Sequence, residues 1–241
     1  MNVTVTGPKV LFSLPGGIRI TETVVNTWAA MAIIVLLCLW LTRNMSVWNP
    51  SKRQLIAEKI YTMLTGLVKN TMGKQNHFFV TYIGALFAMS MTGSLLSLIG
   101  LRPPTADLSV TAAFALVSFV MTNVVKIRGR GVGGWLKSFT EPVAVITPLN
   151  LISEVASPIS MAFRHFGNIA SGVVISALVY GALTALSAKV FAWIPSSFLA
   201  TVPWLTAGIP AVLSIYFDVF TSFLQAYIIC MLTMVYATDS D

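Results

Sequence analysis

Arg164 is the residue whose position in this chain most needs a chemical explanation. It is the only Asp, Glu, Lys or Arg between Glu154 and Lys189, in a stretch made mainly of apolar and small polar residues. At membrane depth a cation costs at least about 2.5–3.5 kcal/mol. Chains keep such a residue where it meets a partner or lies on an ion path, so the remaining sequence must explain what Arg164 meets.

Helical spacing places small and polar residues on the same face as Arg164. They are Ser157, Ser160, Gly167, Asn168, Ser171 and Gly172. Small residues let a second helix approach closely, so we interpret this face as a contact surface that presents Arg164. The alternative is a packing strip in which Arg164 pairs with an internal carboxylate such as Glu154 or Asp218. His165 points about 100° away on a helix, which favours a packing or interface role.

A second polar stripe occurs in the last apolar segment. Its members are Ser214, Asp218, Thr221 or Ser222, and Gln225. An aspartate in a membrane helix is a functional candidate, and with hydroxyls and an amide it could line an aqueous path. The alternative is that Asp218 lies near the outer water interface and does little. Glu154 flanks the start of the preceding long helix, where a solvated or structural role is the simpler interpretation.

The motifs of soluble enzymes are missing from this sequence. It contains no P-loop, no nucleophile elbow and no cluster of metal-ligating residues. Its histidines are His77 and His165, and Cys38 and Cys230 lie in apolar stretches, where we expect free thiols. We therefore expect no catalytic residue, no metal and no cofactor.

The composition indicates a membrane protein. Of the 241 residues 56% are hydrophobic and 10% are charged, whereas soluble domains carry about 25% charged residues. The net charge of +7 does not indicate nucleic-acid binding, because the basic residues cluster just outside apolar runs. The fold class we predict is an all-α polytopic membrane protein, a single integral domain with about five transmembrane spans and an interfacial amphipathic helix.

About 20 helical residues cross a bilayer, and this length sets the expected elements. We predict an extracytoplasmic N-terminus over 1–23, a first span over 24–42, an amphipathic interfacial helix over 49–74, a helical hairpin over 77–125, a polar glycine-rich loop over 126–134, and long helices over 149–190 and 202–237. The segment over 149–190 would form a helix about 60 Å long, twice the membrane thickness, so it must break, tilt strongly or lie partly along the surface.

Basic residues predict the orientation. Ten follow the first and third spans, namely Arg43, Lys52, Arg53, Lys59, Lys69, Lys74, Lys126, Arg128, Arg130 and Lys137. By the positive-inside rule these are cytoplasmic, which puts the N-terminus outside and the C-terminus in the cytoplasm.

Three stretches resemble one known family, subunit a of the bacterial F-type ATP synthase. They are PLNLISEVASPISMAFRHFGNIASG, FDVFTSFLQAYIICMLTMVY and RPPTADLSVTAAFALVSF, and the resemblance that they carry extends over roughly residues 77–238. The resemblance implies two long, tilted antiparallel helices against a rotating ring of c subunits. It also implies a b subunit in the peripheral stalk as a partner, membrane lipid around the chain, and a location in the bacterial cell membrane.

The resemblance also assigns roles to particular residues. It implies that Arg164 is the essential arginine facing the ring carboxylate, with Asn168 and Gln225 at polar positions near it. Many members carry an ionisable residue where this chain has Val173, and His or Glu where it has Asp218. We infer that Asp218 is the main acid of the entry path. We expect Glu154, Ser171, Ser214 and Ser222 to line the half-channels.

The resemblance implies a non-catalytic ion-channel subunit that couples an ion gradient to ATP synthesis. A proton is the expected ion, and Na⁺ stays open because the ion site belongs to the ring. One alternative is a stand-alone secondary transporter that binds an anionic substrate through Arg164, although no repeat typical of that class is evident. Another is an assembly subunit without an ion path, in which uncharged replacements of Arg164 are tolerated.

Overall fold

The computed structural model describes residues 7–13, 19–73, 77–141, 143–190 and 215–238. Its long helices are α1 (Glu22–Thr42), α2 (Lys52–Met72), α3 (His77–Leu95), α4 (Leu108–Ser138), α5 (Thr147–Val190) and α8 (Thr221–Thr238). The 3-10 turns η1 (Leu96–Ile99), η2 (Pro104–Ala106) and η3 (Ala144–Ile146) and the π-helical segment η4 (Ile215–Phe220) lie between them. The strands β1 (Val10–Ser13) and β2 (Arg19–Thr21) form an antiparallel hairpin that the sequence did not predict.

Five helical segments among the described residues are long and apolar enough to cross a membrane. They are Glu22–Thr42, Phe78–Ile99, Leu108–Ser138, Ala144–Val190 and Ile215–Thr238. Large apolar side chains are exposed on them, for example Leu36 at 66% and Leu116 at 60%. Exposed apolar surface on this scale suits lipid or a protein partner and not water. The chain is therefore an all-α multi-pass membrane protein, as predicted.

The first helix after the first span begins and ends at recognisable signals. Ser51 caps α2, because its hydroxyl accepts a hydrogen bond from the Gln54 N–H. Gly73 ends the helix at a φ of 69°, with its own N–H donating to the Lys69 carbonyl. The helix lies inside the predicted range 49–74. Arg53 stacks over the Trp40 ring at 4.6 Å and so links α2 to the end of α1.

The predicted loop over 126–134 is wrong, because α4 runs through this region to Ser138. Gly131 has a φ of 73° and a ψ of 167°, so the helix breaks at that one residue and then resumes. A glycine adopts such angles at little cost, so the chain changes direction at this one residue and needs no open loop.

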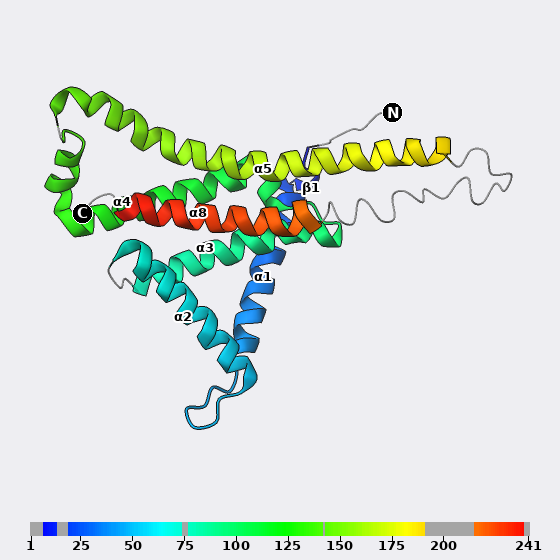
Figure 1. The fold of residues 1–241 in the computed structure, drawn as a ribbon, viewed down its shortest axis with the longest axis horizontal. Coiled ribbons are helices and arrows are strands. Elements are labelled where there is room, and N and C mark those ends of the chain that lie inside the picture. Colours follow the sequence, from blue (N-terminus) through cyan, green and yellow to red (C-terminus); the bar gives the residue numbers. More distant parts are fainter. Residues whose placement is uncertain (1–6, 14–18, 74–76, 142, 191–214, 239–241) are drawn as a thin grey trace.

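The core lies where α8 passes between its neighbours. In Figure 1 α8 runs alongside α3 and α4, while α5 lies across the top and extends beyond both. Phe79, Ile83, Ile229 and Met234 are nearly inaccessible and form the centre of this cluster. α5 contributes Met161 and Ala162 from one face, and the described residues leave much of its opposite face exposed. Of the predicted 202–237 helix, residues 202–214 lie outside the described part, and the remainder is helical.

Candidate functional site

Arg164 lies on the outward face of α5. Its side chain is exposed, and so are Phe163, at 56%, and Gly167 beside it, whereas Ala162 and His165 are buried. Within the described residues its guanidinium makes no hydrogen bond and no ion pair, so it pairs with neither Glu154 nor Asp218. The packing-strip alternative is thus not what the described chain shows.

Large aromatic side chains are exposed on the helices that follow α5. On α8 and η4 the aromatic side chains of Phe220, Phe223 and Tyr227 are exposed by 53%, 48% and 41%. α5 and η4 come close to each other at Gly172, where an added Cβ would lie 3.6 Å from the Phe217 ring. A countercharge stabilises a cation at membrane depth, and the described residues form no ion pair with Arg164.

The other residues predicted near Arg164 differ in their exposure. Asn168 is half-buried, and Ser171 is exposed with its hydroxyl donating to the Asn168 carbonyl at 3.0 Å. Gln225 is 4% exposed and Ser222 1%, so both lie inside the helix packing. Ser214 lies outside the described residues. The structure therefore separates an outward-facing cation from inward-facing polar groups of α8.

Asp218 lies in the π-helical segment and receives a hydrogen bond from η1. The Ser97 hydroxyl donates to Asp218 Oδ1 at 3.0 Å. The two residues lie on a cavity of about 10 Å³, which we call the Asp218 cavity, and this volume is enough for about one water molecule. Its other lining residues are Ser94, Pro103, Ile169, Gly172, Val173, Phe217 and Ser222.

A much larger cavity of about 480 Å³, here called the vestibule, lies next to the Asp218 cavity. Ser97, Pro103 and Val173 line both cavities, and we call these three shared residues the neck. Lys9, Glu22 and Arg102 are the charged residues of the vestibule. Val173 stands where the resembling family often carries an ionisable residue. In this chain Val173 carries no charge, and the carboxylate next to the neck is that of Asp218 in the Asp218 cavity.

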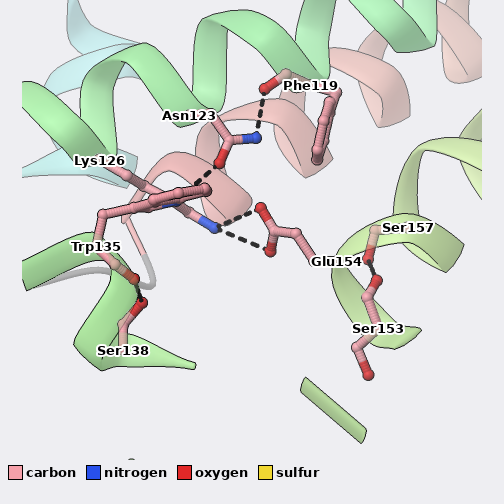
Figure 2. A network of polar contacts seen from close by, with 8 residues as sticks. All are labelled: Phe119, Asn123, Lys126, Trp135, Ser138, Ser153, Glu154 and Ser157. Carbon is pink, nitrogen blue, oxygen red and sulfur yellow. Dashed lines mark hydrogen bonds and ion pairs between the residues drawn. The ribbon is translucent and has the colours of Figure 1, made fainter. Parts of the chain in front are cut away.

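Glu154 belongs to a different region, where α4 meets α5. Its carboxylate pairs with the Lys126 ammonium at 3.4 Å, and the two side chains are only 22% and 16% exposed. Figure 2 shows this pair beside Asn123, whose amide oxygen accepts a hydrogen bond from the Trp135 indole N–H at 2.9 Å. The pair borders a cavity of about 30 Å³, here called the Glu154 cavity. The hydroxyl-bearing residues Ser118, Thr122, Ser157 and Tyr236 also line it.

Sequence reasoning missed the serines that end the second span. Ser90, Ser94 and Ser97 recur at helical spacing, a signal that could have been read. Ser90 lies 3.3 Å from His165 Nε2, and Ser94 lies 2.9 Å from the Thr105 hydroxyl. His165 is fully buried and packs edge-on against Phe114, which agrees with the packing role predicted for it.

Comparison with known proteins places these features in a family. The family model described as ATP synthase A chain matches residues 24–238. ATP synthase subunit a, sodium ion specific, from Propionigenium modestum is 30% identical, with 98% of this chain and 86% of that protein covered. ATP synthase subunit a from Desulforamulus reducens is 31% identical over 90% of this chain and 78% of its own length. ATP synthase subunit a 2 from a Bradyrhizobium species is 35% identical over 68% of this chain and 74% of its own length.

Proposed function

The chain belongs to the ATP synthase A chain family, and from this premise we propose that it conducts ions through two half-channels beside a rotating ring of c subunits. The observation that carries the proposal is Arg164, an exposed cation on a membrane helix, without a countercharge from the described residues. A ring that brings carboxylates past this face would supply the missing charge.

The physical role of Arg164 follows from the cost of charge in lipid. A ring carboxylate that crosses lipid must carry its ion, because the bare anion is too costly there. A guanidinium stays protonated at physiological pH and favours the ionised form of a carboxylate nearby. Each arriving carboxylate therefore releases its ion beside Arg164. The same cation repels an ion that would pass directly between the half-channels, so ion flow requires rotation.

The outer half-channel is supported by the vestibule and the Asp218 cavity. The neck connects a volume of about 480 Å³ to the carboxylate of Asp218. Lysine, arginine and glutamate at the vestibule show that charged groups are tolerated there, as expected at a water-filled entrance. We assign this end to the extracytoplasmic side, where the positive-inside rule places the N-terminus.

The inner half-channel is supported by the Glu154 cavity. It lies between α4, α5 and α8, and its hydroxyl-bearing residues and ion pair could hold water. It reaches Met161 of α5, which is one helical turn from Arg164. The C-terminus and the basic end of α4 then lie in the cytoplasm.

The partners we propose are the c ring along the exposed face of α5 and α8, and a b subunit elsewhere on the chain. ATP chemistry belongs to other subunits in this proposal. The ion is a monovalent cation, with the proton expected, and each charge crossing 100 mV contributes about 2.3 kcal/mol to rotation. The relative from Propionigenium modestum is described as sodium ion specific, so Na⁺ is the competing assignment to test.

Replacement of Arg164 tests the function. In the assembled complex reconstituted into vesicles, Arg164→Ala should abolish gradient-driven ATP synthesis while the subunits still assemble. Arg128→Ala removes an exposed arginine from the end of α4 and should leave synthesis near the wild-type rate. ATP synthesis by Arg164→Ala at a rate close to that of Arg128→Ala would refute the proposal.

Replacement of Asp218 tests the outer path. Asp218→Asn keeps the shape of the side chain and its ability to accept a hydrogen bond from Ser97, but it removes the charge that holds a cation. We expect slower transport and an altered dependence of the rate on outer pH or Na⁺. A variant whose rate and ion dependence both match the wild type would remove Asp218 from the path.

A further inference from the structure

The neck between the vestibule and the Asp218 cavity contains one side chain that can exchange hydrogen bonds. Among these three residues the side chains of Pro103 and Val173 are apolar, whereas that of Ser97 carries a hydroxyl. An ion that moves from the vestibule to Asp218 must therefore pass that hydroxyl or remain fully hydrated. A cavity of about 10 Å³ beyond the neck holds about one water molecule, which is too small for a complete hydration shell.

The Ser97 hydroxyl has two acceptors and a single hydrogen. Its oxygen lies 2.9 Å from the Ser94 carbonyl oxygen and 3.0 Å from Asp218 Oδ1. Since a serine hydroxyl carries one hydrogen and two lone pairs, it can donate to only one of these oxygens at a time. Rotation of the hydroxyl about its C–O bond exchanges the two states without any movement of the backbone.

We propose that Ser97 is the residue that transfers the cation from the vestibule to Asp218, by switching its hydroxyl hydrogen between Asp218 and the Ser94 carbonyl. This inference rests on the proposed function. While the Asp218 carboxylate is empty, Ser97 donates to it and stabilises its negative charge. When Na⁺ arrives, the hydrogen turns to the Ser94 carbonyl, and the Ser97 oxygen turns its lone pairs toward the ion. When a proton arrives, the hydrogen stays directed at Asp218 until it has been transferred, and the hydrogen that replaces it then turns to the Ser94 carbonyl.

For a proton the transfer balances in one relay step. A hydronium ion in the vestibule gives a proton to the Ser97 oxygen, while the hydrogen already on that oxygen passes to Asp218 Oδ1. The hydronium becomes water, the hydroxyl is restored with its new hydrogen, and the carboxylate becomes a carboxylic acid. For Na⁺ no covalent bond changes, because the Ser97 oxygen and the Asp218 carboxylate act together as ligands of the partly dehydrated ion.

The local backbone explains why Ser97 reaches this position. α3 ends at Leu95, and the chain tightens into the 3-10 turn η1 before Gly100 reverses its direction at a φ of 75°. A 3-10 turn advances about 120° per residue instead of about 100°, which changes the direction of Ser97 relative to an unbroken helix. Ser94 is fixed one turn earlier by its contact with the Thr105 hydroxyl at 2.9 Å.

The experiment compares three serine variants in the complete complex reconstituted into vesicles. Gradient-driven ATP synthesis is measured per assembled complex, so that a loss of assembly does not count as a loss of rate. Ser97→Ala should slow synthesis about tenfold, and Ser97→Thr, which keeps a hydroxyl, should recover to within about twofold of wild type. Ser90→Ala is the matched control, because it also removes a buried hydroxyl from α3 but bonds His165 instead of Asp218, and it should stay within about twofold of wild type.

Two further arms identify the ion and separate the two proposals. One uses a proton gradient without Na⁺, and the other a Na⁺ gradient with a protonophore; the gradient that sustains synthesis by the wild type identifies the ion. Ser97→Ala should be slow in that arm. A wild-type rate for Ser97→Ala, or a Ser97→Thr variant as slow as Ser97→Ala, would overturn the role of Ser97 while leaving Arg164 untouched. Persisting synthesis by Arg164→Ala would instead overturn the function itself.

Discussion

The Lys126–Glu154 pair predicts a measurable coupling between α4 and α5. At 3.4 Å and an effective dielectric constant near 20, the attraction between the two charges is about 5 kcal/mol before desolvation. Both side chains are largely but not fully buried, so desolvation offsets most of this attraction. We expect a net coupling free energy of about 1–2 kcal/mol, above the value for exposed pairs and below that for fully buried ones.

A double-mutant cycle on the complex in detergent measures that coupling. The variants are Glu154→Gln, Lys126→Gln and the double replacement, each followed by thermal unfolding. Either single variant should lose stability because an unpaired charge remains, and the double variant should lose less than the sum. The exposed pair Lys137–Glu141, at 3.8 Å on neighbouring turns, is the matched control and should couple by about 0.3–0.5 kcal/mol. The reasoning would be refuted if the stability losses of the two single variants summed to that of the double variant within about 0.3–0.5 kcal/mol.

Three further predictions concern backbone and charge. Gly172→Ala should be tolerated, because the new Cβ would lie 3.6 Å from Phe217, an ordinary contact distance. Gly172→Leu should force α5 and η4 apart and slow gradient-driven ATP synthesis. Equal rates of synthesis in these two variants would contradict this prediction. Partial burial raises the pKa of the Asp107 carboxyl, but hydrogen bonds from Ser109 outweigh this effect and hold the pKa below its usual value. The charged carboxylate therefore stabilises the fold above about pH 4, and this contribution disappears as the pH falls further. Melting temperatures of wild type and Asp107→Asn should accordingly differ at neutral pH and converge in acid. Gly131→Ala should cost about 1 kcal/mol, because alanine strains at a φ of 73°, and an unchanged melting temperature would exclude that strain.

The sequence could predict features that depend on local chain properties. Apolar length alone predicts the spans, because a bilayer imposes one length on every helix that crosses it. Ser51 predicts the start of α2 through the hydrogen bond its hydroxyl accepts. Arg164 was identified by its isolation in an apolar segment, and the structure places it on an exposed face.

Features that depend on helix rotation could not be read from spacing. Ser97 and Asp218 are 121 residues apart, and nothing local to either residue indicates their contact. The Lys126–Glu154 pair likewise depends on the way α4 and α5 pack together. Gln225 is 4% exposed, and its position relative to Arg164 depends on how α5 and α8 pack, which spacing along a single helix does not give.

The π-helical segment Ile215–Phe220 carries Asp218 immediately before α8 begins. Its wide turn is marked by the Thr221 hydroxyl, which donates to the Tyr216 carbonyl five residues earlier. A wide turn accommodates one residue more than an α-helix would, so the residues before and after it are free to face different directions. Deleting a single residue there would convert the turn to α-helix and swing Asp218 by about 100° about the axis. The Asp218 carboxylate would then lose its contact with Ser97, while the buried face of α8 kept its place. The outer path therefore depends on the number of residues in this turn as well as on the carboxylate that it carries.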